Sequence, residues 1–557
     1  MATIRREIVQ AAINRAFALA NPNIQNNLEK QHVFRIQTVL ADKSLTKDEK
    51  SFAVKELKEN FDYEKIFYNE GTKRICENCH DECLATLYCE HCIRNYLKEN
   101  FSNWTSGNND IDNLIQQCQI KALTPYLIVE WIPYNKLQNI KYLTKGGCSE
   151  IYTAVWIDGR YVEWYLKEKQ LKRSGIINVV LKKLENVESA NKSWFDEGLS
   201  HLHISSKSFL IVQCYGLTQN PFNGNYMIVM NRMNVNLREY LQQNHNKLTW
   251  KERIQIIYSI INAVYDIHEE SSIHRDLHSG NILFFQNDQR FYISDLGFCG
   301  PANKPLDSIY GNLPYIAPEV IVNKKYTFAS DIYSIGILMW EISSGQPPFI
   351  NKHDYDLAIR IINGMRPKTI PDTPLEYKEL MEQCWDANPM IRPDISTLFN
   401  KISNIYRWYC QNENEQRIIS KITRINNSQL NTRYNVNSSS TNSSFFGNFS
   451  ASSSNWNISS RVYNFENLPE PKNATKEEQD AYHSIQFDFD LQDGLIIVEE
   501  QSNKRSYFDD DEKDLASNSN KKVNSNNNEE IQYHEIGYQY TQRNYATSKM
   551  DLNYLLN

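Results

Sequence analysis

A short run near the middle of the chain combines a base, a carboxylate and an amide at fixed spacing. His274, Arg275 and Asp276 precede Leu277, and Asn281 stands five residues after Asp276. A carboxylate can accept the proton of a hydroxyl group, and an amide oxygen at this spacing can reach a magnesium ion beside a phosphate chain. The run therefore predicts transfer of a phosphoryl group to a hydroxyl, with Asp276 as catalytic base and Asn281 as a magnesium ligand.

A second carboxylate follows in the segment Ser294-Asp295-Leu296-Gly297, nineteen residues after Asp276. Mg²⁺ prefers hard oxygen donors, which makes Asp295 the predicted main magnesium ligand. Two carboxylates and one amide would then share the phosphate site.

Four cysteines form two Cys-X-X-Cys pairs separated by nine residues, and these are Cys76, Cys79, Cys89 and Cys92. Each pair can present two thiolates to one tetrahedral zinc ion, so we predict a small structural zinc module over residues 76–125. Cys83, His80 and His91 are spare ligands. A redox pair or unligated cysteines are alternatives, and a nucleic-acid knuckle is disfavoured because the flanks mix acidic and basic residues. Such a module would dock a partner or the rest of the chain.

The elements that would position these residues differ along the chain. Residues 1–75 are charged and predict helices, with Ile4, Ile8, Ala11 and Leu19 at helical spacing. From about residue 137 to 405 the composition is that of a globular enzyme, with strand-like runs first and helical periods after them. The strand-like runs are 150–155, 178–184 and 226–230.

Beyond about residue 410 the composition changes. Residues 425–460 are rich in Asn and Ser, and residues 501–530 in Asp, Lys, Asn and Ser, with a less polar island at 464–500. Such segments bury too little apolar surface to offset the entropy of ordering. We therefore predict a largely disordered tail over 410–557.

Composition limits the class of protein. The chain has 557 residues, a net charge of −7 and a pI of about 6.0, which gives no general basic field for nucleic acid or membranes. No run of eighteen apolar residues is present, so no membrane span is expected. Eleven cysteines, mostly scattered, suit a reducing compartment, and we expect a cytoplasmic location, with the nucleus possible. An amphipathic transit peptide is a minor alternative.

Residues from about 137 to 405 resemble a eukaryotic protein kinase of the tyrosine-kinase-like group. The phrase Tyr-Gly-Asn-Leu-Pro-Tyr-Ile-Ala-Pro-Glu at 310–319 and Gly-Gln-Pro-Pro-Phe at 345–349 are similar to those of an expanded fungal set of such kinases. Segments 42–46 and 69–76 also look like that set. The resemblance implies ATP and Mg²⁺ as cofactors, protein substrates and, by default, Ser/Thr phosphorylation in intracellular signalling. It leaves the oligomeric state open.

The implied fold is α+β and bilobal, with a five-stranded N-lobe that has one helix and a mainly helical C-lobe. The predicted organisation is a helical region over 1–75, a Cys-rich zinc-knuckle-like module over 76–125, a kinase domain over 137–405 and the tail over 410–557.

The resemblance also implies an ATP site. Lys182, in a Val-Val-Leu-Lys strand, would contact the α- and β-phosphates, with Glu197 as its ion-pair partner and Asp196 or Glu188 as alternatives. Adenine would meet the backbone of Asn231 and Met233 after a gatekeeper at Met230. The glycine-rich loop, which could also be a plain hairpin turn, would comprise Leu143, Thr144, Lys145, Gly146, Gly147, Cys148, Ser149, Glu150 and Ile151.

Residues 311–319 would form the shelf for a peptide substrate, and Glu319 would pair with Arg392. Asp331 would cap the backbone of the catalytic loop, residues 274–281. Arg275 suggests control by phosphorylation of the activation segment, which ends at residues 311–319. Ser308 and Tyr310 are the nearest acceptors.

Some positions depart from the family pattern. His278 stands where many Ser/Thr kinases have Lys, and Asn312 stands where Thr is usual. At a spine position about one helical turn after Glu197, the family normally has an apolar side chain, and here either His201 or Leu202 would occupy it. These departures keep a second hypothesis open, in which the chain is a pseudokinase scaffold that binds partners, with or without ATP, and lacks efficient catalysis.

Overall fold

The computed structural model describes residues 4–145, 149–184, 194–301, 309–349, 355–412 and 460–493, except for the side chains of residues 194–197, 301 and 485–493. Among the helices in these ranges, none is both long and apolar enough to cross a bilayer.

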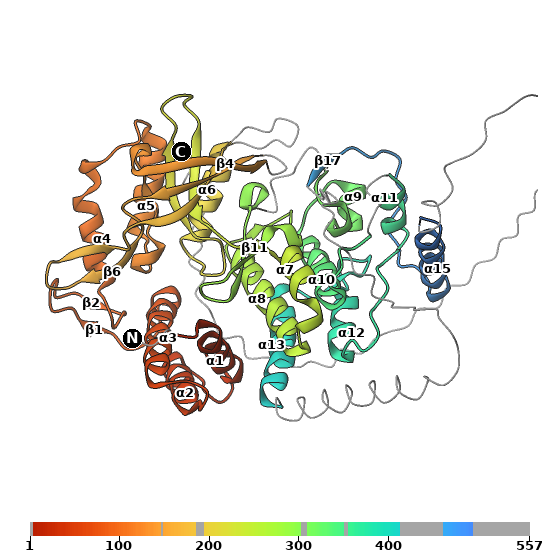
Figure 1. Ribbon diagram of the computed structural model, residues 1–557, viewed down its shortest axis with the longest axis horizontal. Coiled ribbons are helices and arrows are strands. Elements are labelled where there is room, and N and C mark those ends of the chain that lie inside the picture. Colours follow the sequence, from red (N-terminus) through yellow and green to blue (C-terminus); the bar gives the residue numbers. More distant parts are fainter. Residues whose placement is uncertain are drawn as a thin grey trace, which may run out of the picture. The chain divides into compact units, whose positions relative to one another are not determined.

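Three helices form the N-terminal region, and they are α1 (Arg6–Leu19), α2 (Leu28–Ala41) and α3 (Lys47–Tyr68) (Figure 1). Helix α3 begins at Thr46, which forms a capping box with Glu49. The buried face of α1 is shifted from the expected one, because Ala11 is exposed and Ile4 and Ile8 are only partly buried. Its buried residues include Val9, Ala12, Ile13 and Ala16.

The N-terminal helices pack against the later part of the chain. The hydroxyl of Tyr63 on α3 donates to the carbonyl of Lys207, and its ring lies 4.0 Å from that of Phe209. The guanidinium of Arg407 donates to the carbonyl of Ala18 at 3.1 Å. Residues 6–68 therefore share an interface with the predicted kinase domain.

A half-buried carboxylate next to this interface makes stability depend on pH. Burial raises the pKa of Asp266 to about 7, and the hydroxyl of Ser208, at 2.5 Å, only partly offsets this. The folded protein keeps this proton at pH values where the unfolded chain has lost it. The free energy of unfolding therefore falls as pH rises from about 4 to about 7, by at most about 1.4 kcal/mol per pH unit.

We expect Asp266→Asn to flatten that pH dependence and to stabilise the protein above pH 7 by about 1–2 kcal/mol. Thermal unfolding of both proteins between pH 5 and 8 measures it. Equal slopes in the two proteins would contradict the assignment. Asp372→Asn, in an exposed loop, is the matched control.

The Cys-rich segment contains β1 (Arg74–Ile75), β2 (Glu82–Cys83), α4 (Glu90–Glu99) and α5 (Asn109–Ile120). Asp62 of α3 is fully buried and accepts hydrogen bonds from the backbone N–H groups of Thr86 and Leu87, both at 2.7 Å. This carboxylate fixes the loop before α4 against α3.

The main sheet has six strands in the order β3-β9-β10-β8-β5-β4. Strands β4, β5, β8, β9 and β10 are the five expected from the predicted kinase domain. Strand β3 precedes that domain and adds a sixth strand by pairing with β9 in parallel. Gly216 permits this pairing, because a Cβ there would lie 1.7 Å from the carbonyl oxygen of Glu130. The strands are β3 (Glu130–Trp131), β4 (Leu137–Lys145), β5 (Glu150–Trp156), β8 (Ile177–Lys183), β9 (Cys214–Gln219) and β10 (Tyr226–Asn231).

A separate hairpin of β6 (Tyr161–Tyr165) and β7 (Gln170–Arg173) lies between β5 and β8 in the sequence. One helix, α6 (Trp194–Ser205), follows β8. Residues of α5 share an apolar cluster with α6 and the sheet, so the segment before the predicted domain supports this helix.

The second part is mainly helical, with α10 buried along nearly its whole length. Its helices are α7 (Leu237–Asn244), α8 (Trp250–Glu269), α9 (Pro318–Asn323), α10 (Phe328–Ser344), α11 (Tyr355–Ile362), α12 (Leu375–Cys384) and α13 (Ile395–Gln411). Its short strands are β11 (Val235–Asn236), β12 (Ser272–Ile273), β13 (Ile282–Phe285), β14 (Arg290–Ile293), β15 (Gly300–Pro301) and β16 (Ile309–Gly311). A sheet-rich lobe followed by a helical lobe confirms the predicted α+β bilobal fold.

Part of the predicted disordered tail forms regular structure. Strand β17 (Arg461–Tyr463) pairs with β16, and helix α15 (Lys476–Asp493) follows it. Residues 460–493 thus depart from the expectation, because their apolar side chains pack against the core of the helical lobe.

Candidate active site

The loop that carries Asp276 is fixed by a buried carboxylate from α10. Asp331 is 1% exposed and accepts hydrogen bonds from the backbone N–H groups of His274 at 2.8 Å and Arg275 at 3.0 Å. Burial alone would raise the pKa of Asp331. The hydrogen bond from His268 and the electrostatic interactions with His268 and His274 keep this pKa below its ordinary value. Asp331 therefore lies where the sequence analysis expected a cap on this loop.

Asp276 and Asn281 lie together. The amide nitrogen of Asn281 donates to the backbone carbonyl of Asp276 at 2.9 Å and lies 3.4 Å from its carboxylate. This orientation uses the amide N–H groups and leaves the amide oxygen to act as an acceptor. An amide oxygen beside carboxylates is a donor set that suits Mg²⁺.

Lys182 reaches the second predicted magnesium ligand. Its ammonium group lies 2.5 Å from the Asp295 carboxylate, although the lysine comes from β8 and the aspartate follows β14. Asp295 has a left-handed backbone, with φ of 56°, and this turns the chain into the next short helix. The predicted phosphate-binding cation and a predicted metal ligand therefore converge. The side chain of Glu197 and the whole of Glu188 lie outside the described residues, as does the side chain of Asp196.

His201 on α6 couples that helix to the Asp295 segment. Its ring nitrogen Nε2 accepts the backbone N–H of Leu296 at 3.1 Å, and the side chain is 1% exposed. Leu202 is also buried but belongs to an apolar cluster with α5 and β9. Of the two spine candidates, His201 is the one that contacts the Asp295 segment.

The predicted glycine-rich loop coincides with the β4–β5 hairpin. Leu143, Thr144 and Lys145 lie on β4, Ser149 directly precedes β5, and Glu150 and Ile151 lie on β5. Lys145 pairs with Glu150 in the ladder. Gly146, Gly147 and Cys148 lie outside the described residues.

The predicted adenine-binding segment leaves the sheet at β10. Met230 and Asn231 end that strand, and the backbone N–H of Asn231 donates to the carbonyl of Gln213 at 2.9 Å. The side-chain amide of Asn231 contacts the sulfur of Met233 at 3.7 Å. These residues lie between the sheet and α7, where the connection between lobes is expected.

The predicted peptide shelf lies against Asp276. A Cβ on Gly311, which has a φ of +145°, would lie 3.3 Å from the Asp276 carboxylate, so glycine allows this close approach. The Asn312 side chain is 2% exposed, and its amide atoms find no hydrogen-bond partner among the described residues.

Glu319 and Arg392 form the predicted ion pair. Two parallel hydrogen bonds of 2.7 Å join the guanidinium to the carboxylate, and the Arg392 side chain is fully buried. Arg392 also donates to the carbonyl of Ala329 at 2.9 Å. The pair ties α9, at the end of the shelf, to the segment before α13.

We expect Arg392→Ala to lower the free energy of unfolding by about 3 kcal/mol or more, because it leaves the partly buried Glu319 carboxylate unpaired. Chemical denaturation measures the change, with Arg360→Ala on α11 as the matched control. A loss below about 1 kcal/mol, typical of surface pairs, would contradict this prediction.

The suggested control by activation-segment phosphorylation receives limited support. The guanidinium of Arg275 donates to the carbonyl of Phe298 at 3.2 Å. Tyr310 is 4% exposed and its ring stacks on that of Phe298 at 3.7 Å, so β16 would have to move before Tyr310 could be modified. Ser308 lies outside the described residues.

Sequence reasoning missed one residue at this site. The hydroxyl of Ser460 lies 2.8 Å from each carboxylate oxygen of Asp276. It also lies 3.1 Å from Nε2 of His278. Tyr463 and Phe465 alternate with the polar Asn464, and this short period-two pattern is the sequence signal that could have predicted a docked strand here.

The geometry gives His278 a definite tautomer when it is neutral. Its Nδ1 accepts the backbone N–H of Gly280 at 3.1 Å, so the proton lies on Nε2, which then donates to Ser460. A Cβ on Gly280 would lie 2.8 Å from the imidazole ring, so glycine is needed for this packing. His278, which departs from the family pattern, thus faces the Ser460 hydroxyl.

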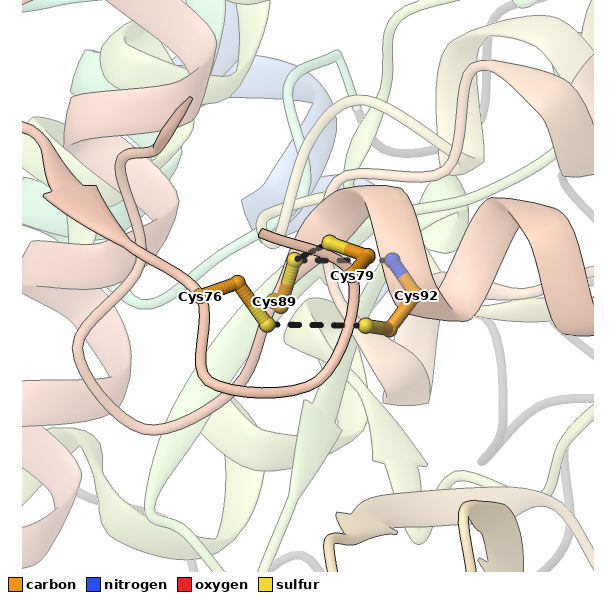
Figure 2. Close-up of side chains that lie close together, drawn as sticks. All are labelled: Cys76, Cys79, Cys89 and Cys92. Atoms are coloured by element: carbon orange, nitrogen blue, oxygen red, sulfur yellow. Dashed lines mark hydrogen bonds between the residues drawn. The ribbon is translucent and has the colours of Figure 1, made fainter. Parts of the chain in front are cut away.

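The four predicted zinc ligands also converge, and their side chains point toward one another (Figure 2). The sulfurs of Cys76 and Cys92 are 3.6 Å apart, as are those of Cys79 and Cys89. Tetrahedral zinc with Zn–S bonds of about 2.3 Å requires sulfurs about 3.8 Å apart, close to this spacing. His80 and His91 belong to neither cluster of potential metal ligands found in the described chain, whereas Cys83 lies near Cys89 and Glu90.

Comparison with known proteins gives a family match over the same part of the chain. Residues 137–402 match the model of the protein tyrosine and serine/threonine kinases. The chain is 30% identical over 195 residues to the human dual serine/threonine and tyrosine protein kinase, which is 34% of this chain and 20% of the relative.

Two relatives from Dictyostelium discoideum are similar. The dual specificity protein kinase zakA is 29% identical over 214 residues, covering 35% of this chain and 27% of the relative. The "Probable serine/threonine-protein kinase gdt4" is 27% identical over 293 residues, covering 50% of this chain and 16% of the relative. The chain thus spans about a quarter or less of the length of these relatives.

Proposed function

Because residues 137–402 form a eukaryotic protein kinase domain, we propose that this chain is an ATP- and Mg²⁺-dependent protein kinase that phosphorylates serine or threonine. The tyrosine-kinase-like group, the fungal set and a role in intracellular signalling are parts of the same proposal, as is the assignment of the site residues below.

One observation carries the proposal. Four predicted site residues come from three separate segments, yet hydrogen bonds or ion pairs join Asn281 to Asp276 and Lys182 to Asp295. The backbone N–H of Ser294, next to Asp295, donates to the carbonyl of Asn281 at 2.8 Å and links the two pairs. Phosphoryl transfer requires mainly positioning and charge neutralisation, and these are the groups that supply both.

Each group has a distinct role in the proposed mechanism. Asp295 and the amide oxygen of Asn281 would hold magnesium, which neutralises developing charge on the phosphates when bound. Lys182 would orient the phosphate chain through its ammonium group. Asp276 would accept the proton of the attacking hydroxyl, and Asp331 keeps the catalytic loop in place for this transfer.

The geometry at Asp276 supports serine or threonine as the acceptor. With β17 paired to β16, the one-carbon side chain of Ser460 brings a hydroxyl to 2.8 Å from Asp276. A tyrosine hydroxyl lies about 6.5 Å from its Cα, so a peptide backbone in this position would carry it past the carboxylate.

Purified full-length chain, incubated with Mg²⁺ and radiolabelled ATP, tests the activity. We expect label in a generic protein substrate and in phosphoserine or phosphothreonine after hydrolysis. Lys182→Met should remove most of it, whereas Lys183→Met, on the same strand, should not. Incorporation no greater than that of Lys182→Met would reject the enzyme and favour the scaffold, and label in phosphotyrosine alone would reject the acceptor class.

We also propose that Cys76, Cys79, Cys89 and Cys92 bind one structural zinc ion. Backbone and side-chain N–H groups support the thiols, since Asn78 donates to the sulfur of Cys76 at 3.4 Å and to that of Cys92 at 3.2 Å. Elemental analysis of the purified chain should find one zinc per chain. Less than about a tenth of that amount, without chelator, would reject the site.

A cytoplasmic or nuclear location completes the proposal. The close thiol pairs of the Cys-rich module and the buried cysteines of the helical lobe suit a reducing compartment. Imaging of the tagged chain in its own cells tests this, and a secreted or organellar signal would overturn it.

A further inference from the structure

Residues 461–463 form an added strand at the start of the predicted peptide shelf. β17 runs antiparallel to β16, with Arg461 opposite Gly311, Val462 opposite Tyr310 and Tyr463 opposite Ile309. Strand addition to an exposed edge is a recurrent way to bind extended peptides. Here the peptide belongs to the same chain as the shelf.

The segment that follows is fixed at several further points on the helical lobe. The ring of Tyr463 stacks on that of Phe465 at 5.6 Å, and Phe465 lies 5.9 Å from Tyr355 of α11. The backbone N–H of Lys472 donates to the carbonyl of Ile362 at 3.0 Å. These contacts extend the docked segment well beyond the strand.

Two polar side chains anchor the next part. Asn473 accepts the backbone N–H of Ala387 at 2.9 Å and donates to the Asp386 carboxylate at 3.0 Å. Gln479 of α15 donates to the carbonyl of Gly364 at 2.5 Å and accepts the backbone N–H of Arg366 at 3.3 Å.

Gly364 is part of this docking site. A Cβ at that position would lie 2.1 Å from the backbone nitrogen of Ala474, so any other residue would push the segment away. Its φ of +92° also disfavours other residues. The surface of the helical lobe is therefore shaped to fit residues 472–479.

Docking places one hydroxyl at the catalytic base. Ser460 is 8% exposed, directly precedes β17 and donates its hydroxyl proton toward the two Asp276 carboxylate oxygens, each at 2.8 Å. The Nε2–H of His278 orients the same oxygen. We propose that Ser460 is an intramolecular phosphorylation site, modified by the kinase domain of its own chain; this inference rests on the proposed function.

The reaction balances with ATP as the phosphoryl donor. The Oγ atom of Ser460 attacks the γ-phosphorus and forms an O–P bond, while the bond from that phosphorus to the β,γ-bridging oxygen breaks. ADP leaves with the electron pair of the broken bond, and the hydroxyl proton passes to the Asp276 carboxylate.

The product disfavours its own docking. A phosphoserine carries a charge of about −1.5 to −2 at pH 7 and would lie against the carboxylate of Asp276. Repulsion between these anions would expel the segment from the shelf. Phosphorylation of Ser460 therefore frees the shelf for other protein substrates.

Phosphatase-treated full-length chain with Mg²⁺ and ATP provides the test, with phosphopeptides read by mass spectrometry. We expect Ser460 phosphorylation at a rate constant that stays the same over a hundredfold dilution, as for a reaction within one chain. A rate constant proportional to concentration would overturn the intramolecular step. Ser484→Ala on α15 is the matched control and should leave Ser460 phosphorylation intact, because that hydroxyl bonds only its own helix backbone among the contacts found.

A mixing experiment separates the two reaction routes. Asp276→Asn chain, which keeps Ser460, is incubated with active Ser460→Ala chain. We expect no phosphate on Ser460 of the inactive chain, and its rapid modification there would overturn the proposal.

The anchors provide a second, independent test. The double variant Asn473→Ala/Gln479→Ala should slow Ser460 phosphorylation at least tenfold and speed phosphorylation of an added protein substrate. Unchanged rates would show that docking is not needed. Label in the added substrate without label on Ser460 would reject this inference alone, whereas label in neither would reject the kinase function as well.

Discussion

Asp276→Asn should reduce phosphoryl transfer to a protein substrate about a thousandfold, within the range usual for loss of a general base. The substitution keeps the size of the side chain but removes the atom that accepts the hydroxyl proton. The hydrogen bond from Asn281 to the backbone carbonyl of residue 276 remains, so the loop should keep its conformation.

The measurement is the initial rate of label transfer at saturating ATP, with thermal unfolding to show that the variant is folded. Asp372→Asn, an exposed loop position, serves as the matched control and should keep full activity. A folded Asp276→Asn variant that retained more than about a tenth of the rate would reject Asp276 as the base.

Loss of the metal is expected to have the largest effect on stability. Structural zinc contributes roughly 10 kcal/mol or more to the folding of small zinc modules at neutral pH. Cys89 is fully buried at the start of α4 and is one of the four converging thiols. Cys89→Ser should therefore abolish stoichiometric zinc and unfold the segment from β1 through α4.

Hydrogen exchange over residues 74–99 measures this unfolding, and elemental analysis measures the zinc. Chelation of the wild-type protein should give the same exchange pattern. Cys410→Ser, a buried cysteine on α13, is the control and should keep one zinc. Protection of residues 74–99 that survived the loss of zinc would contradict a structural role.

Asp276→Asn and loss of zinc are expected to affect different parts of the protein. The proposed role of Asp276 is in the reaction. The Cys-rich module is tied to α3 through Asp62, and α3 contacts the kinase domain through Tyr63. Loss of zinc should thus also lower thermal stability of the kinase domain, while Asp276→Asn should not.

The local motifs were informative because each has a fixed spacing set by chemistry. Asp276 and Asn281 lie on one loop, and the Cys-X-X-Cys pairs each form one turn, so their proximity follows from short sequence separation. Glu319 and Arg392 lie far apart in the sequence, yet their pairing was anticipated from family motifs, and the structure places them 2.7 Å apart.

Other features depended on contacts between distant segments. The parallel strand β3 has two residues, too few for a periodic signal, and its place in the sheet depends on Gly216. The buried face of α1 is set by its packing against α2, α3 and α13. Helical spacing alone predicted a buried face about one residue away from the observed one.

The sequence by itself predicted the reaction class, the two lobes, and the candidate ligands of magnesium and zinc, because these are encoded by residue types at short, fixed separations. Only the tertiary structure decided that Lys182 meets Asp295, that His278 faces the Ser460 hydroxyl, and that Ser460 lies at Asp276. Composition identified residues 425–460 as too polar to form a core. A docked strand needs no core of its own, because β16 supplies its hydrogen bonds and the helical lobe supplies its apolar surface.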